Sequence, residues 1–359
     1  FANWMSDGLL TPVSDLLTNL LSWAPAWASG FLVDGLIGGV GTVLTFLPIL
    51  VVFFAVLGTL EDVGYLARAA YVMDRFMHLM GLHGKSFMPL FLGFGCNVPA
   101  VLGSRIVEEK RTRLLTIILA PLVPCTARLA VIAFLAPAFF GAALAAPVSW
   151  LLVAINLVVL AVVGVVYNRI VFAGKHTAFI MEMPLYHAPN LRSVGLYVWS
   201  NTISFLKKAG SLILIASAVI WLLSNVPGGG PDRSVLAFLG RGLEPAGRVL
   251  GLGDWRLITA LIASFVAKEN VIATLGILYG GAAGTALATQ VATNLIPAAR
   301  LAFLVVTMLF VPCLATTATM RQETGSWRWP ALSIALLLAL SLGAGAITYQ
   351  AFGLMTAFR

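Results

Sequence analysis

The long stretches without a charged residue are the feature that most restricts how this chain can fold. Residues 129–168 contain no Asp, Glu, Lys or Arg, and similar runs recur along the sequence. A charge at the centre of a bilayer costs at least about 2.5 kcal/mol, so such runs are expected where a helix crosses lipid. Only 10% of the 359 residues are charged and 60% are hydrophobic, with a mean hydropathy of +0.97. This composition excludes a water-soluble globular domain.

The uncharged runs predict an all-α polytopic membrane protein with about eight transmembrane helices, since one crossing takes about 20 mostly apolar residues. Between the runs, apolar and polar residues alternate at helical spacing, which is typical of helices lying in the membrane interface. The expected spans are residues 35–60, 86–104, 114–127 continued across Arg128, the later part of 129–168, 209–226, 257–279, 301–320 and 330–352. The expected interfacial helices are residues 4–27, 65–80, 181–206 and 235–250.

The net charge of +8 comes from basic residues grouped between the apolar runs. Such groups are typical of loops that face anionic lipid. No basic stripe interleaved with aromatic residues is present, so the bilayer is the expected partner and nucleic acid is not. The chain begins at Phe1 without a cleavable leader, which indicates a portion of a longer polypeptide.

A weak internal repeat divides the sequence. Residues 94–98 (FGCNV) precede 123–127 (VPCTA), as residues 265–269 (FVAKE) precede 311–315 (VPCLA), and a Gly-Leu pair precedes each block at 81–82 and 251–252. Related halves with broken helices place substrate sites at the midplane of many transporters. We therefore expect an amphipathic N-terminal segment at 1–34, a first half at 35–168, an amphipathic connection at 169–208 and a second half at 209–359. The sequence leaves open whether the halves are parallel or inverted.

All three cysteines lie at or near helix-breaking residues inside expected spans. Cys96 and Asn97 lie between two glycines and a proline, and a proline directly precedes both Cys125 and Cys313. Irregular backbone at membrane depth is stable only when it is buried in protein or lines a polar cavity. Thiols and an amide in that setting suit a soft or borderline divalent cation. The sequence predicts a metal path formed by these four residues; packing of each thiol as a small buried side chain is the alternative.

The prolines at these breaks also release backbone carbonyls. Because proline has no N–H, the carbonyl four residues before each proline loses its helical partner. The carbonyls concerned belong to Gly95, Ala120 and Met308, which we expect beside the same path.

Two pairs of charged residues are further candidates. Lys268 and Glu269 lie inside an otherwise apolar span, where charges mark transport pathways by default. An ion pair that locks the bundle, with Arg128 and Asn270 as partners, is the alternative.

Glu61 and Asp62 end the first span, where two carboxylates would attract a dication to a pore mouth. A solvated helix end is an equally good interpretation. The four histidines lack the i, i+4 spacing of a zinc site and are interpreted as interfacial side chains: His78, His83, His176 and His187.

Together these motifs resemble the membrane domain of the bacterial ferrous iron transport protein B family over nearly the whole chain. The similar segments of the first half are residues 60–70 (LEDVGYLARAA), 84–87 (GKSF), 93–100 (GFGCNVPA) and 124–129 (PCTARL). Those of the second half are 265–269 (FVAKE), 312–316 (PCLAT) and 321–327 (RQETGSW). In this family the two halves are gate domains.

The resemblance implies Fe²⁺ uptake across the bacterial cytoplasmic membrane by a multi-pass permease that is not itself an enzyme. It implies Fe²⁺ as cargo, no bound organic cofactor, and Cys96, Cys125 and Cys313 as iron-contacting thiols. Glu61, Asp62, Lys268, Glu269 and Glu323 also fall in its motifs, with less definite roles.

The implied partners are a G-protein domain, in the same or a separate chain, small cytoplasmic accessory proteins of iron uptake, and a second copy of the chain. The sequence departs from the family pattern at Asn270, usually valine, and at Ala130, often proline. Two other functions remain open: recognition or transport of a nucleoside-like organic solute, and a membrane assembly partner that does not transport. Aromatic and amide side chains converging on a cavity would favour the organic solute.

Overall fold

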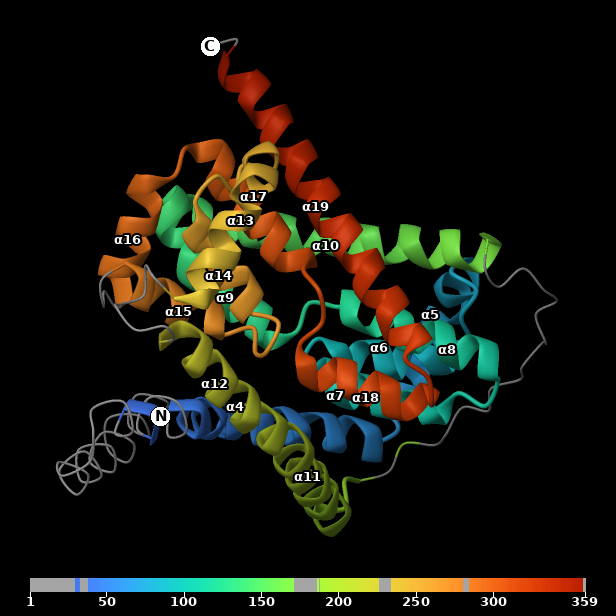
Figure 1. Cartoon of the computed structure of the whole chain (residues 1–359). Helices are drawn as coiled ribbons and strands as arrows, with labels where there is room; N and C mark the ends of the chain where they lie inside the picture. The colour runs from blue at the N-terminus through green and yellow to red at the C-terminus, as the bar shows by residue number, and fades with distance from the viewer. Residues whose placement is uncertain are drawn as a thin grey trace. The chain divides into compact units, whose positions relative to one another are not determined.

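The structure, a computed structural model, describes residues 30–32, 38–170, 186, 188–225, 234–279 and 284–357. All regular structure in these ranges is helical, which confirms the predicted all-α class. The chain forms two compact units (Figure 1). Unit 1 contains residues up to Tyr65 and Leu185–Leu236, and unit 2 contains Leu66–Pro184 and Ala237–Arg359. The predicted interfacial helix at 4–27 lies outside the described residues.

Unit 1 is built on α4 (Gly38–Asp62), which packs against α11 (Leu191–Phe205) and α12 (Ser211–Asn225). A short π-helical turn, η6 (Leu206–Gly210), joins α11 to α12. The Tyr197 ring meets Phe54 edge-on, with 6.5 Å between ring centroids. It also lies against Gly58, where a Cβ atom would come within 2.9 Å of the ring. Close packing of this aromatic side chain therefore holds α11 on α4.

Unit 2 contains two series of helices in the same order. The first is α5 (Tyr65–Leu79), η3 (Gly84–Ser86), α6 (Phe87–Gly93), α7 (Asn97–Gly103), η4 (Ser104–Ile106), α8 (Lys110–Leu119), η5 (Ala120–Leu122), α9 (Thr126–Phe140) and α10 (Ala142–Ile170). The second is α13 (Val235–Val249), α14 (Trp255–Ala263), α15 (Asn270–Leu278), α16 (Gly284–Asn294), α17 (Pro297–Leu309), α18 (Leu314–Thr324) and α19 (Arg328–Ala357). Fully buried side chains of α8, α9 and α17 form much of the core, among them Ile118, Ile132 and Phe303.

The chain leaves α5 and α13 by the same turn. Gly81 and Gly251 have φ values of +73° and +74°, in the left-handed region that glycine adopts without a steric penalty. In both turns the next amide bonds back to the carbonyl five residues earlier, at 2.9 and 2.8 Å. Each glycine lies under the long helix that ends its series, beneath Asn168 of α10 and Tyr349 of α19. The Gly-Leu pairs in the sequence therefore mark equivalent positions of a structural repeat.

The two series run in opposite directions. Arg113, near the start of α8, forms an ion pair with Glu323, near the end of α18, at 2.8 Å. α9 packs against α17. The helix that follows the Pro124–Cys125 turn of the first series therefore lies beside the helix that precedes the Pro312–Cys313 turn of the second. In Figure 1, the path from α8 to α9 crosses unit 2 opposite to the path from α17 to α18. The repeat is inverted, a point that the sequence alone left open.

Four helical segments of the described residues are long and apolar enough to cross a membrane: Lys110–Phe140, Ala142–Ile170, Pro297–Thr324 and Arg328–Gly353. A bent pair, Leu50–Asp62 with Tyr65–Leu79, makes a fifth if counted as one span. The predicted spans at 86–104 and 257–279 are instead pairs of short helices, α6 with α7 and α14 with α15. Helices of 7 or 9 residues rise only about 10 to 14 Å, so neither member crosses alone.

Replacing Gly81 by alanine should destabilise the protein more than the same change at Gly325. Both glycines have positive φ, and Gly325 lies in the left-handed region that costs other residues about 1–2 kcal/mol. At Gly81 a new Cβ would also come within 2.1 Å of Asn168, whereas at Gly325 nothing lies within 4 Å. We expect Gly325→Ala to lose only the backbone cost and Gly81→Ala about 1–3 kcal/mol more from overpacking. Denaturant unfolding in detergent measures both, and equal losses would contradict the predicted packing.

Candidate functional site

Each cysteine occupies the residue immediately before a helix of unit 2. Cys96 precedes α7, Cys125 precedes α9 and Cys313 precedes α18, all with extended backbone angles. The structure therefore places every cysteine at a helix interruption, as the glycines and prolines predicted. All three residues are partly exposed. A cysteine that only fills space in a core is usually fully buried.

A backbone hydrogen bond joins the break and the Pro-Cys turn within each half. The Gly95 carbonyl accepts from the Thr126 amide at 3.2 Å and from the Thr126 hydroxyl at 2.9 Å. In the second half the Phe265 carbonyl accepts from the Leu314 amide at 2.7 Å. The residue after the cysteine thus donates to the broken helix in both cases. This contact brings Cys125 beside the break that contains Cys96.

The carbonyls freed in the first half already have protein donors. Ala120 accepts from the Val123 amide at 3.1 Å. The Asn97 amide group lies 3.2 Å from the carbonyl oxygens of both Gly93 and Ala120, and its nitrogen donates to both. Asn97 therefore ties α6 to the turn before Cys125. Met308 is buried within α17.

Two buried basic side chains bind the backbone just before Cys313. Arg128 is fully buried and donates to the Pro121 carbonyl at 2.8 Å and to the Phe310 carbonyl at 2.5 Å. Lys268 donates to the Val311 carbonyl, and its ammonium lies 5.1 Å from the centre of the Phe310 ring. Lys268 thus directs one of its three ammonium donors to a backbone carbonyl. Arg128 connects the two halves at their breaks, because Pro121 and Phe310 belong to different series.

The three thiols lie close enough for charges on them to interact, and Glu269 is near enough to act on Cys96. The Cys313 sulfur also lies 3.1 Å from the Thr316 hydroxyl. Within the part of the chain that the structure describes, however, no group of three or more His, Cys, Asp and Glu side chains is close enough to hold a metal ion. The thiols gather at the paired breaks without forming a closed metal cage.

The other predicted carboxylates lie elsewhere. The Glu323 side chain is only 2% exposed and binds Arg105 at 2.5 and 2.9 Å and Arg113 at 2.8 Å. It ends the 11-residue α18, about 15 Å along the helix from Cys313. In unit 1, Glu61 forms a hydrogen bond with Tyr197, and Asp62 accepts from the Asn190 amide at 2.6 Å. Their role at a pore mouth stays a prediction.

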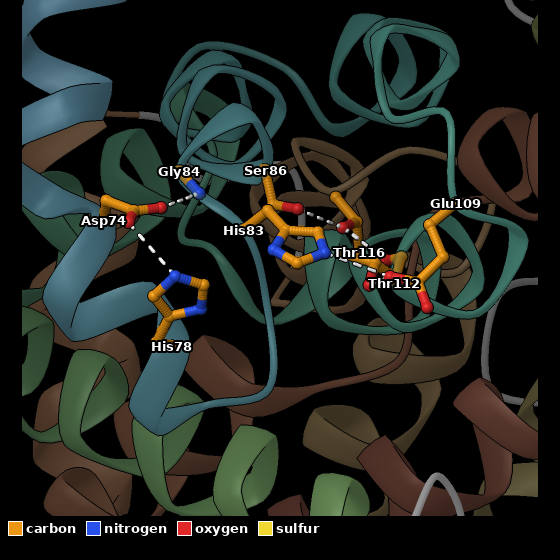
Figure 2. A network of polar contacts seen from close by, with 8 residues as sticks. All are labelled: Asp74, His78, His83, Gly84, Ser86, Glu109, Thr112 and Thr116. Atoms are coloured by element: carbon orange, nitrogen blue, oxygen red, sulfur yellow. Dashed lines mark hydrogen bonds and ion pairs between the residues drawn. The ribbon is translucent and has the colours of Figure 1, made fainter. Parts of the chain in front are cut away.

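The structure also contains a polar network that the sequence did not reveal. His83 is only 8% exposed, so its interpretation as an interfacial side chain is wrong. Its Nε2 atom lies 3.0 Å from Oε2 of Glu109, 26 residues away, and the same oxygen accepts from the Thr112 hydroxyl at 2.6 Å (Figure 2). The hydrogen bond from Thr112, with a smaller contribution from His83, holds the pKa of Glu109 below its usual value despite partial burial. Glu109 is therefore ionised at neutral pH.

A second histidine stands beside the first. Nε2 of His78 lies 3.1 Å from Oδ2 of Asp74, and the other oxygen of Asp74 accepts from the Gly84 amide at 2.6 Å. The rings of His78 and His83 meet edge-on, with 5.6 Å between their centroids (Figure 2). The i, i+4 spacing of Asp74 and His78 on α5 is visible in the sequence. The contact of His83 with Glu109 requires the fold.

Two family models match the chain. One, described as gate, nucleoside recognition, matches residues 43–139 and 206–327. The other, described as ferrous iron transport protein B C terminus, matches residues 148–201. With the paired broken helices, these matches define a gate-type, multi-pass membrane protein of the bacterial cytoplasmic membrane. The chain belongs to the ferrous iron transport protein B family and represents its membrane region, as the motifs predicted.

The relatives are long proteins of which this chain spans about half. The Fe(2+) transporter FeoB of Staphylococcus aureus (strain COL) is 36% identical over 351 residues, covering 96% of this chain and 52% of the relative. The Fe(2+) transporter FeoB of Methanocaldococcus jannaschii is 34% identical over 325 residues, covering 87% and 48%. A fusion protein of Porphyromonas gingivalis, named Fe(2+) transport protein A/Fe(2+) transporter FeoB, is 34% identical over 355 residues, covering 84% and 42%. No solved structure matches the chain.

Replacing Glu323 by glutamine should destabilise unit 2, because Arg105 and Arg113 would lose a common, nearly buried counter-charge. Breaking a well-buried ion pair by removing one partner costs about 3–5 kcal/mol, and the exposure of Arg105 reduces this to about 1–3 kcal/mol. Glu108→Gln is the matched control, since its pair with Lys85 is exposed and should contribute little. Thermal unfolding in detergent compares the two variants. If both unfold like the parent, Glu323 does not clamp α18 to α8.

Proposed function

We propose that this chain conducts Fe²⁺ across the cytoplasmic membrane along a route that passes Cys96, Cys125 and Cys313. The relatives that match nearly all of it are named Fe(2+) transporters. The observation that carries the proposal is that every cysteine of the chain is partly exposed at a helix break of one inverted repeat. Ferrous iron accepts thiolate ligands, and broken helices at membrane depth are where transporters bind their substrates.

The contacts at the breaks favour the thiols over the freed carbonyls as ligands. The Gly95 carbonyl already accepts two hydrogen bonds, and Asn97 donates to Ala120. A carbonyl ligand would require these bonds to break, whereas a thiol needs only to lose a proton when it binds the metal. A route with few simultaneous thiolates admits the ion and still releases it.

The thiols have a second role in this proposal, which is to offset the positive charge of the basic side chains at the site. Arg128 and Lys268 both donate to carbonyls next to the Pro312–Cys313 turn. Positive charge there would repel a dication in surroundings of low dielectric constant. Thiolates, formed when the cysteines lose their protons on binding the metal, would supply the opposing negative charge.

Parts beyond this chain complete the proposed transport system. The Porphyromonas gingivalis relative is named as a fusion with an Fe(2+) transport protein A. We infer that a small accessory protein works with the membrane region. Any GTP hydrolysis would take place in a G-protein domain rather than in unit 1 or unit 2. The chain itself acts as a permease and not as an enzyme.

Recognition of a nucleoside-like solute is the second candidate, supported by the description of the gate family. A purine or pyrimidine site needs aromatic and amide groups that converge on a cavity. The amide of Asn97 is instead used on backbone carbonyls, and thiols flank the breaks. Binding of ⁵⁵Fe²⁺ and of labelled nucleosides to the purified protein separates the two candidates.

Serine substitution of the cysteines tests the thiol path. Cys96→Ser, Cys125→Ser and Cys313→Ser should each lower the initial rate of Fe²⁺ uptake into proteoliposomes at least about tenfold, because a hydroxyl is a much poorer ligand for this ion. Thr307 is buried in α17, ahead of the Pro312–Cys313 turn. Thr307→Ser is therefore the control and should transport like the parent. Unchanged uptake in all three cysteine variants would remove the thiols from the mechanism.

A further inference from the structure

His83 has one ring nitrogen with a partner and one without. Oε2 of Glu109 accepts from the Thr112 hydroxyl and lies 3.0 Å from Nε2 of His83, so the Nε2 atom carries the proton in this contact. In the neutral ring, Nδ1 then presents a lone pair. This atom is buried and has no hydrogen-bond partner. A buried acceptor without a partner costs about 1–3 kcal/mol, which calls for an explanation.

His78 repeats the arrangement on the facing side. Its Nε2 atom contacts the Asp74 carboxylate at 3.1 Å, which leaves Nδ1 of this ring as the second nitrogen donor. The rings stand edge-on, 5.6 Å apart between centroids. Figure 2 shows the unpartnered nitrogen of His83 on the side of its ring that faces Asp74 and His78, away from Glu109. A carboxylate that binds one imidazole nitrogen and frees the other is the usual support of a metal-binding histidine.

The surroundings provide access and negative charge. The side chains of His78 and Asp74 are 44% and 35% exposed, whereas that of His83 is 10% exposed, so the pair has an open side and a buried side. Two carboxylates, Asp74 and Glu109, support the two rings. The neighbouring Lys85 is neutralised by its own pair with Glu108 at 2.8 Å. The acidic groups in direct contact with the two rings are therefore these two carboxylates.

We propose that His78 and His83 bind a first-row divalent metal ion, such as Fe²⁺ or Zn²⁺, through their Nδ1 atoms, with Asp74 and Glu109 orienting the rings. The two rings supply two protein ligands, and water supplies the rest, which agrees with the absence of any three-residue ligand group in the described part of the chain. Two imidazoles bind such ions weakly enough to release them.

The position gives this site a place on the route to the thiols. η3 follows His83 directly and leads into α6, and the break at Cys96 lies at the other end of α6. The seven residues of α6 span about 10 Å along the helix axis between the end that follows His83 and the break at Cys96. The histidine pair is thus a docking position outside the first break. Its binding of metal does not depend on the thiol path.

Equilibrium dialysis of anaerobic Fe²⁺ and of Zn²⁺ tests the site. The protein should carry Cys96→Ser, Cys125→Ser and Cys313→Ser, so that the thiols contribute nothing. We expect this parent to bind one equivalent of metal, and His78→Gln or His83→Gln to weaken that binding at least tenfold. Glu109→Gln, which keeps the ligand but weakens its support, should weaken binding about 10-fold to 100-fold. Glu244→Gln, an equivalent change on α13 of the second series, is the matched control and should bind like the parent.

Thermal unfolding separates loss of the site from loss of the fold. Zn²⁺ should raise the unfolding temperature of the parent and of Glu244→Gln by the same amount, and raise that of a folded His83→Gln less, because a more weakly bound ligand stabilises less. Metal binding of equal affinity in the parent and in both histidine variants would overturn the proposal. So would a parent that binds no metal, which would leave a water molecule as the partner of His83. Neither result would affect the test of the thiol path.

Discussion

The structure of unit 2 depends on how backbone groups find partners where helices break in an apolar environment. An unpaired amide or carbonyl in lipid costs several kcal/mol, so each interruption must be matched by a donor from another element. Thr126 and Leu314 donate to the breaks at Gly95 and Phe265, and Asn97 donates to two further carbonyls. These contacts make the breaks stable, and stable breaks expose the cysteines that follow them.

The inverted arrangement explains the position of the buried basic residues. Because α9 lies beside α17, the start of one helix faces the end of the other. Arg128, at the start of α9, therefore reaches the carbonyl of Phe310 just after α17, as well as that of Pro121 in its own series. Guanidinium suits this task, since its several donors are fixed in one plane. The same antiparallel packing brings Arg113 to Glu323 at the far end of the spans.

The sequence predicted most of the features that depend on local chemistry. The all-α class follows from the long uncharged runs, and the breaks at the glycines and prolines follow from backbone rules that act within a few residues. The Gly-Leu pairs marked the repeat, but their turns appear only in the structure. It did not predict which donors occupy the freed carbonyls, because Gly95 and Thr126 are 31 residues apart. For the same reason it did not predict the partners of Glu323, which lie 210 and 218 residues away. The place of Glu323 on the path stays a prediction. His83 was misread because nothing near it in the sequence indicates Glu109.

The hydrogen bond that joins each helix break to its Pro-Cys turn is donated by a main-chain amide. A side-chain donor would require one residue type at that position, whereas every residue except proline has a main-chain amide. The two halves use different residues at this position, and the amides of Thr126 and Leu314 donate equivalent hydrogen bonds. Two duplicated segments can therefore drift apart in sequence while their architecture persists. This tolerance explains why the internal repeat is weak in the sequence but clear in the structure.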